Sequence, residues 1–305
     1  MAFRIVSIEH PAEVHARNGQ LVVIESEGTA SIPIEDIMML IADAPDIRIS
    51  TMCLDMLAVH HVMVVTMGRN HMPSSMTIPM VANARQSRVA YAQATMPGDL
   101  RDAIWGRIVV SKIQNQARSL AILGLPGAEE VWSFSQGVMP GDPTNREGAA
   151  AKCYFQHLQP GLNRRCEDPL NSALNYGYAI VRSLVARSLV STGFVPAFGI
   201  HHHSQLNAFN LADDLMEPLR PAVDLVALGV VGTTCRLSRN QRSKLREVAL
   251  CKVDLEDRIV SVHNAVSRMS ETLRGAINCG DARVMQLPIV RPIDDTDMGV
   301  GEKCA

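Results

Sequence analysis

The reactive side chains of this sequence gather where three consecutive histidines precede a group of carboxylates. His201–His203 are followed by Asp213, Asp214 and Glu217. Asn210 with Asp213 has the pattern of a helix start, and from that helix Asp214 and Glu217, three residues apart, would project from one face. Neighbouring side chains diverge in a strand or a helix, so at most one or two of the histidines can act together.

Imidazole and carboxylate groups in one polar pocket are typical of a divalent-metal site. Carboxylates supply hard oxygen ligands, and an imidazole in the set favours Mn²⁺ over Mg²⁺. Two alternatives stay open from the residues alone. The carboxylates can be solvated charges that stabilise a helix start, and the histidine run can be a surface tract that binds metal adventitiously.

A further carboxylate, Glu147, lies in the stretch "DPTNREGAAAKCYF". Thr144 and Glu147 have the spacing of a capping box, and Pro143 favours a turn before the helix. The pattern predicts a helix start at this point. By itself it gives Glu147 the ordinary role of a cap.

The segments that must position these residues change near residue 75 from short β-rich runs to segments with the hydrophobic period of a helix. The first 70 residues are mostly short β-rich runs, and Asn18-Gly19 between two of them is a strong hairpin signal. We also expect helices over residues 35–43 and 51–61, a strand over 62–67, and a linker over 68–79.

Beyond the linker, apolar residues recur every three or four positions, which predicts helices. These segments cover residues 81–96, 99–124, 144–158, 169–193 and 240–255, whereas residues 288–305 show no period. The expected fold class is α+β. A small N-terminal β-sandwich-like domain (1–75) would precede a larger all-α catalytic domain (76–305).

Composition is that of an ordinary soluble globule of 305 residues, with 47% apolar and 20% charged residues. The N-terminus has no signal-peptide pattern, and the apolar runs are too short to span a bilayer, which predicts a cytoplasmic location. Seven cysteines lie far apart with no CxxC pair. Their spacing argues against both a disulfide framework and a structural zinc site.

Basic residues are unevenly distributed. Residues 1–75 carry four Lys or Arg against nine Asp or Glu, although the whole chain has a net charge of −2. The basic surplus therefore lies in the second part, where it could contact phosphates. The candidates are Lys112, Arg164, Arg165, Arg242, Lys244 and Arg246. Each can equally be a solvated surface charge, and Trp105 and Tyr176 fit core positions better than base-stacking ones.

Five blocks of the sequence together resemble the CRISPR adaptation integrase, the Cas1 family, and especially its type II branch. The blocks are "GDPTNREGAAAKCYF", "NYGYAIVRSLVARSLVSTG", "GIHHHSQLNAFNLADDLMEPLRP", "WGRIVVSKIQNQ" and "IPIEDIMMLI". They occur in the family's order over most of the chain. The resemblance is thus more specific than any single block.

The resemblance assigns roles that the pattern alone leaves open. It implies that Glu147, His202 and Glu217 hold a divalent metal, Mg²⁺ or Mn²⁺, and that Asp214 supports them. The run of three histidines departs from the usual pattern of the family. The choice of His202 over His201 or His203 therefore rests on its place in the G-x-x-H stretch that begins at Gly199.

The resemblance also implies a reaction and partners. The 3′-hydroxyl of a captured double-stranded DNA fragment would attack a phosphodiester at the edge of a CRISPR repeat, in a transesterification that serves antiviral defence. An asymmetric homodimer, two of which flank a Cas2 dimer, would carry it out, with a Cas9 effector as a further candidate partner. Two alternatives compete: a structure-selective nuclease on branched DNA, and a non-catalytic DNA-binding scaffold.

Overall fold

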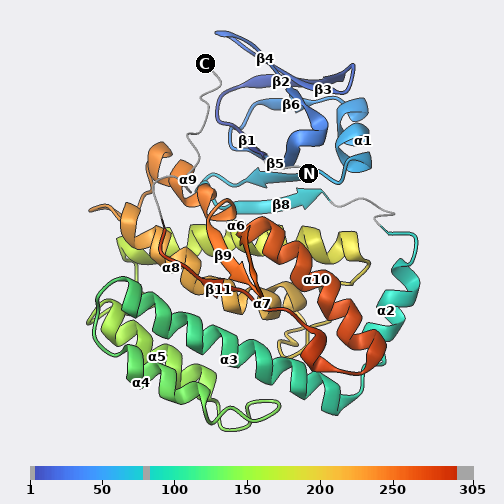
Figure 1. Ribbon diagram of the computed structural model, residues 1–305. Helices are drawn as coiled ribbons and strands as arrows, with labels where there is room; N and C mark the ends of the chain where they lie inside the picture. The colour runs from blue at the N-terminus through green and yellow to red at the C-terminus, as the bar shows by residue number, and fades with distance from the viewer. Residues whose placement is uncertain (1–3, 78–82, 294–305) are drawn as a thin grey trace. The chain divides into compact units, whose positions relative to one another are not determined.

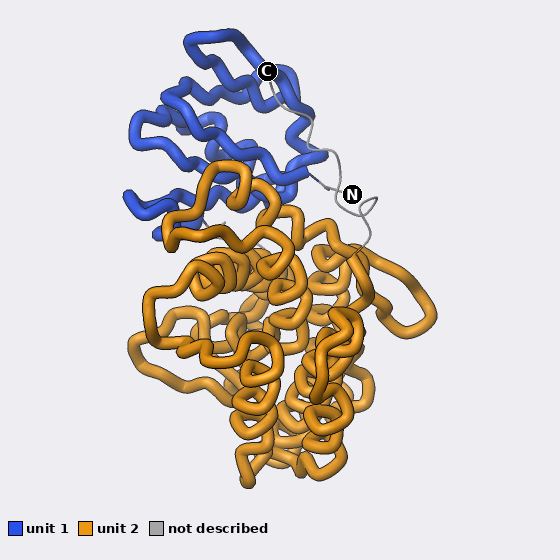
Figure 2. The backbone as a smooth tube through the Cα atoms, turned by 90° about the vertical axis from the view of Figure 1, so that its left-hand side faces the viewer, with its two compact units in different colours: residues 1–84, 300–305 blue, residues 85–299 orange. Residues whose placement is uncertain are grey.

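The computed structural model describes residues 4–77 and 83–293, which form two compact units (Figure 2). The first unit extends to Ala84, and the second begins at Arg85. The end of the predicted linker and residues 294–305 of the aperiodic segment lie outside the described residues. Within those residues, no helix is both long and apolar enough to cross a membrane. The domain boundary at residue 75 stays a prediction.

Among its described residues, the first unit contains two four-stranded sheets and one α-helix, α1 (Thr51–Val59) (Figure 1). One sheet has the order β1 (Arg4–Ile8), β5 (Ile37–Ala42), β7 (Met63–Met67) and β8 (Pro73–Thr77), in which only β8 runs antiparallel to its neighbour. The other has the order β4 (Gly28–Pro33), β3 (Gln20–Glu25), β2 (Ala12–Arg17) and β6 (Ile47–Ile49).

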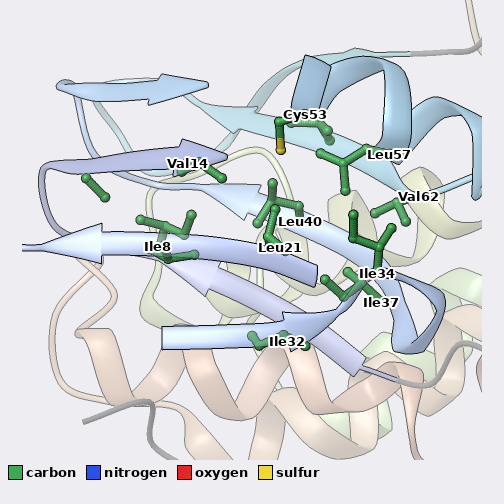
Figure 3. Packing of buried hydrophobic residues seen from close by; sticks show 13 residues of the cluster. Ile8, Val14, Leu21, Ile32, Ile34, Ile37, Leu40, Cys53, Leu57 and Val62 are labelled. Carbon is green, nitrogen blue, oxygen red and sulfur yellow. The ribbon is translucent and has the colours of Figure 1, made fainter. Parts of the chain in front are cut away.

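The predicted hairpin joins β2 and β3. Asn18 and Gly19 have φ angles of 51° and 73°, the left-handed conformation that a tight two-residue hairpin turn requires. The hairpin directs Val14 and Leu21 into a core that also receives Leu40 from the other sheet (Figure 3). Because both sheets bury side chains in this core, the predicted β-sandwich-like N-terminal part is confirmed.

Two predictions in this unit are wrong. Residues 35–43 are not a helix, because only Ile34–Asp36 form a 3₁₀ turn (η1) and β5 follows with all six residues buried. A strand buried on both faces between parallel neighbours has a continuous apolar run, which periodicity cannot tell from a buried helix. The predicted linker is also partly regular, because β8 pairs with β7 inside it.

The second unit is mainly helical, as predicted. Its helices are α2 (Gln86–Ala94), α3 (Gly98–Ile122), α4 (Ala128–Ser135), α5 (Arg146–Leu158), α6 (Pro169–Thr192), α7 (Asn210–Met216), α8 (Arg220–Val230), α9 (Arg239–Arg246) and α10 (Val262–Cys279). The long helices α3 and α6 have 25 and 24 residues. Helix α3 packs against α4, α5 and α8, and α6 packs against α7, α8 and α10 (Figure 1).

Local sequence explains where α6 begins. The Asp168 carboxylate accepts hydrogen bonds from the backbone N–H groups of Leu170 and Asn171, which otherwise have no partner in the first turn of a helix. Pro169 occupies the first position, where its missing N–H costs nothing. The predicted start of this helix is therefore confirmed.

A small sheet in the second unit was not predicted. Strands β10 (Arg258–Ser261), β9 (Lys252–Leu255) and β11 (Ile289–Val290) are antiparallel neighbours in that order. The helix predicted over 240–255 is wrong in its second half, because α9 ends at Arg246 and leads through a 3₁₀ turn, η3 (Glu247–Ala249), to β9. Another 3₁₀ turn, η4 (Ala282–Val284), precedes β11.

Candidate metal centre

Two acidic side chains that are 70 residues apart meet at one cation, the ammonium of Lys112. Its Nζ contacts both Glu147 Oε1 and Glu217 Oε2. Lys112 lies on α3, Glu147 at the start of α5, and Glu217 in the 3₁₀ turn η2 (Glu217–Leu219) between α7 and α8. Two oxygens that contact the same nitrogen lie within about 6 Å of each other. The carboxylates thus face the same point.

Glu147 is free for this contact because other side chains cap its helix. Asn145 is the N-cap, and its side chain accepts a hydrogen bond from Gly148 N. The Asp142 carboxylate accepts hydrogen bonds from the N–H groups of Arg146 and Glu147, both at 2.9 Å. The capping box predicted from Thr144 is therefore wrong, since two other residues satisfy the amides of the first turn.

Glu217 is held from two sides. Besides Lys112, it pairs with Arg220, whose Nε lies 2.8 Å from Glu217 Oε1. Only 4% of Glu217 is exposed, and Asp214 is completely buried. The alternative that these carboxylates are solvated helix-start charges is therefore wrong. The predicted helix start at Asn210 is confirmed, since α7 begins there.

Asp214 organises the histidine loop. Its carboxylate accepts hydrogen bonds from the backbone N–H groups of Ile200 (2.5 Å), His201 (3.1 Å) and His202 (3.0 Å). A side chain at Gly199 would overlap this turn, because an added Cβ would lie 2.0 Å from the His202 carbonyl oxygen. The loop thus closes tightly around one buried carboxylate.

The three histidines have different surroundings. His202 Nδ1 lies 2.7 Å from Asp214 Oδ1, which leaves Nε2 as the nitrogen that a metal would take. A carboxylate on the other ring nitrogen is the usual support for a ligating histidine. His201 instead stacks on Trp105, with ring centroids 4.2 Å apart, and His203 Nδ1 lies 2.8 Å from the His201 carbonyl oxygen. These contacts favour His202 among the three.

Opposite charges keep the centre ionised. Burial alone would raise the pKa of Glu217, but Arg220 and Lys112 outweigh it and lower the pKa to about 2. Burial would lower the pKa of Lys112, yet the charges of Glu217 and Glu147 raise it above its ordinary value. The hydrogen bond to Asp214 outweighs the burial of His202 and raises its pKa.

The donor set fits a hard divalent cation. Glu217 Oε2 is buried and, within the described residues, accepts no regular hydrogen bond, although the Lys112 ammonium contacts it. Carboxylate oxygens with one imidazole suit Mg²⁺ or Mn²⁺. The ligand atoms of Glu147, His202 and Glu217 do not all lie within 4.8 Å of one another here. The Lys112 ammonium lies between the two carboxylates, in the position that a metal ion bound by both would occupy.

The model of the family "CRISPR associated protein Cas1" matches residues 5–130 and 144–250 of this chain. The chain belongs to the Cas1 family. It is 29% identical over 300 residues to the CRISPR-associated endonuclease Cas1 of Neisseria meningitidis serogroup C (strain 8013), which covers 97% of this chain and 99% of that protein. A CRISPR-associated endonuclease Cas1 of Pyrobaculum aerophilum is 30% identical over 231 residues, 69% of this chain and 76% of its own.

Solved structures support the fold of this Cas1-family chain. A casposase bound to integration product superposes with a TM-score of 0.76 at 16% identity, covering 97% of each chain. A Cas1 protein from Thermotoga maritima gives 0.71 at 16% identity, covering 91% of this chain and 98% of its own. The α+β class, with N-terminal strands and a helical C-terminal part, is therefore confirmed.

The six cations predicted to contact DNA have unlike environments in this Cas1-family chain. Lys112, Arg242 and Arg246 are buried, and Arg246 Nη1 lies 3.3 Å from Tyr176 Oη. Lys244 and Arg165 are exposed. Trp105 and Tyr176 are core residues, as predicted. Which of the six cations contact DNA stays a prediction.

Arg164 and Arg220 both lie next to a buried polar network of Tyr154, Tyr178 and Asp224. Arg164 hydrogen-bonds Asn171 and Asn175, and its guanidinium lies over the Tyr178 ring. Tyr154 and Tyr178 both donate to the buried Asp224, and burial raises the pKa of Asp224 to about 6. Arg220 lies over the same Tyr178 ring, 4.7 Å from its centroid.

Sequence reasoning missed Arg220 and Asp224 and gave Lys112 only a DNA contact. Arg220 follows Glu217 by three residues, a spacing that brings side chains together on a helix. Asp224 is a lone charge in the apolar run "PAVDLVALGV". Charged residues are almost never fully buried unless paired, so a lone Asp in an apolar run predicts a buried polar partner. The sequence therefore contained a signal for both Arg220 and Asp224.

Proposed function

We propose that this Cas1-family chain is a metal-dependent DNA integrase of CRISPR spacer acquisition. It joins the 3′-hydroxyl ends of a captured DNA fragment to a CRISPR repeat by transesterification, with Mg²⁺ or Mn²⁺ as cofactor. The observation that supports this proposal is the convergence of Glu147 and Glu217 on the Lys112 ammonium. The charge of Glu217 also acts on His202. Family membership supports the CRISPR context, since the curated relatives are named CRISPR-associated endonucleases.

Glu147, His202 and Glu217 would hold the metal. When bound, it polarises a phosphoryl oxygen, lowers the pKa of the attacking hydroxyl and stabilises the leaving oxygen. The Asp214 carboxylate accepts a hydrogen bond from Nδ1 of His202. This bond keeps the proton on Nδ1 and leaves the lone pair of Nε2 for the metal. Arg220 holds Glu217 by one oxygen, and Lys112 balances the two carboxylates before the metal enters. No Ser or Cys nucleophile is needed.

DNA and protein partners belong to the same proposal. The exposed cations Arg165 and Lys244 and the half-buried Arg164 are the available phosphate contacts among the six predicted residues. Lys112, Arg242 and Arg246 would need to change their contacts first. A homodimer, a Cas2 dimer between two such homodimers, and a Cas9 effector are the proposed protein partners. A chain of a Cas6-RT-Cas1–Cas2 complex shares the fold, with a TM-score of 0.71 over 93% of this chain and 36% of its own.

A fragment-integration assay tests the proposal. A labelled double-stranded fragment with free 3′-hydroxyls is incubated with the full chain, Cas2, Mn²⁺ or Mg²⁺, and a plasmid that carries CRISPR repeats. Glu147→Ala should lose joining while it keeps its circular dichroism spectrum and its affinity for the fragment. Full joining by this variant would refute the assignment.

A structure-selective nuclease is the second candidate, because the same centre can activate water instead of a 3′-hydroxyl, and the named relatives are endonucleases. A fragment with 3′-deoxy ends separates the two. An integrase joins only the hydroxyl-ended fragment, whereas a nuclease cuts branched DNA whatever the fragment ends are. The scaffold alternative predicts no specific metal binding and no effect of a His202 substitution.

A further inference from the structure

A second cluster of potential ligands lies toward the other end of α5. Cys153 and His157, four residues apart, project from one face of this helix, and α4 brings Glu130 opposite them. One ligand atom from each of Glu130, Cys153 and His157 lies within 4.8 Å of the other two. His157 Nε2 lies 3.1 Å from Glu130 Oε2.

We propose that Glu130, Cys153 and His157 bind a thiophilic divalent metal ion, Zn²⁺ in the first place, that links α4 to α5. Zinc takes Cys sulfur, His nitrogen and Glu oxygen as ligands, and a site with only three protein ligands keeps water in the fourth position. This site is independent of the proposed integrase reaction. It also differs from the zinc patterns that the cysteine spacing excluded, because its ligands come from a tertiary contact and not from a CxxC pair.

The separations suit an ion of this size. A tetrahedral zinc ion with bonds of about 2.0–2.3 Å holds its ligand atoms roughly 3.3–3.7 Å apart. The distance of 3.1 Å between His157 Nε2 and Glu130 Oε2 is therefore close to the separation of two atoms that bind the same zinc ion. Cys153 Sγ lies within 4.8 Å of a ligand atom of each of these two residues.

The backbone of the α4 N-terminus accommodates the histidine ring. Gly127, the N-cap of α4, has a φ of 89°. A Cβ at this position would lie 2.2 Å from His157 Cδ2, so any other residue would push the ring out of place. The absence of a side chain at 127 lets the imidazole lie against the helix start, with Nε2 beside Glu130.

The charges of the ligands match a divalent ion. A Cys153 thiolate and the Glu130 carboxylate carry two negative charges, and His157 binds as a neutral imidazole. Without an ion, burial and the nearby Glu130 raise the pKa of Cys153 to about 11. Binding would release the thiol proton to solvent, because a coordinating thiol is deprotonated. A thiolate with an imidazole selects zinc-like ions over Mg²⁺ or Mn²⁺.

The site is separate from the candidate metal centre. Cys153 lies six residues after Glu147, and His157 lies ten residues after it. These separations correspond to roughly 9 and 15 Å along a helix. One ion cannot bridge such distances. An ion at the second site would hold together the two helices that flank residues 136–145, the loop that carries Asp142. It would thereby steady the start of α5.

Cobalt titration of the metal-stripped full-length protein tests this inference, because Co²⁺ replaces Zn²⁺ and a thiolate ligand gives a near-ultraviolet charge-transfer band. We expect the band to saturate at one Co²⁺ per chain and to disappear on addition of Zn²⁺ but not of Mn²⁺. Cys153→Ser should abolish the band. Glu130→Gln and His157→Ala should weaken cobalt binding at least about tenfold, a cost typical even of losing an outer-shell partner.

Two matched variants separate the outcomes. Cys279→Ser removes an exposed thiol elsewhere and should keep the band. Glu147→Gln should also keep it, so loss of integration without loss of cobalt binding distinguishes the two proposals. A band that persists in Cys153→Ser, or that is absent from the unsubstituted protein, would overturn the inference. Glu130 is exposed, so Glu130→Gln serves if the cysteine variant does not fold.

Discussion

The two polar clusters on helix α5 differ in burial, charge and chemistry. At its start, Glu147 meets Glu217 and Lys112, and the latter two are buried, with 4% and 5% of each residue exposed. Further along, Cys153 is buried, but 62% of the Glu130 side chain is exposed. The first cluster already contains cations that balance its carboxylates, whereas the second contains a thiol and an imidazole beside one carboxylate.

This difference bears on the ion that each cluster is proposed to bind. A buried carboxylate must be paired, because the cost of removing its charge from water is several kcal/mol. Lys112 and Arg220 supply that pairing for Glu217, so a metal ion there has to compete with an ammonium. Within the part of the chain that the structure describes, the ion pair at the second cluster joins Glu130 to His157 and includes no Lys or Arg. We therefore expect the first cluster to bind a hard ion reversibly and the second to bind a thiophilic ion.

The largest expected effect is on strand transfer. Glu147→Gln should reduce the rate by at least about 10²–10³-fold, comparable to the loss of one group that stabilises charge in a transition state. The matched control is Glu129→Gln, an exposed acidic residue of α4, which should keep the rate. Equal losses in both variants would show that the start of α5 has no special role. The measurement is the initial rate of fragment joining.

The next effect is on stability without metal. Lys112→Met leaves Glu147 and Glu217 facing each other and should lower the free energy of unfolding by about 3 kcal/mol, the low end for breaking a buried ion pair. Urea denaturation in EDTA measures this loss, and added Mn²⁺ should restore most of it. Lys152→Met, at an exposed position of α5, is the control. A variant as stable as the parent in EDTA would contradict the proposed charge balance.

Acid should weaken the first cluster in a defined window. Because the folded pKa of Glu217 is lowered to about 2 from 4.5, its contribution is present above pH 4.5 and is lost as the pH falls toward 2. Linkage puts this contribution at about 3 kcal/mol. Urea unfolding from pH 6 to 3 should show a shallower pH slope in Glu217→Gln than in the parent. Parallel slopes would refute the role of Arg220 and Lys112.

The smallest effect concerns the support of His202. Asp214→Asn removes the carboxylate that holds Nδ1 and should weaken Mn²⁺ binding by about 10–100-fold, as loss of an outer-shell partner does. Calorimetric titration with Mn²⁺ measures the change. Asp213→Asn is the neighbouring control, because Asp213 pairs with Arg182 on α6. If Asp213→Asn weakened Mn²⁺ as much as Asp214→Asn, the assignment of His202 would need revision.

Local patterns in the sequence were enough for many elements, whereas the roles of the candidate site residues depended on the family resemblance. Asn18-Gly19 predicted its hairpin because its turn needs positive φ, and the recurrence of apolar residues predicted a helix from residue 169, where α6 begins. Such features depend on a few neighbouring residues. By contrast, residues 37–42 became a strand because parallel neighbours on both sides were available, which no local pattern reports.

The sequence by itself determined which residue types were available for chemistry and the mainly helical character of the second unit. Through family resemblance it also predicted the set Glu147, His202 and Glu217. Only the tertiary structure decided that Lys112 lies between the two carboxylates, that Asp214 holds His202, and that Cys153 meets Glu130. Each of these contacts joins residues far apart in the chain. Spacing along a chain specifies which side chains share a helix face, but packing between helices decides which charges must neutralise one another.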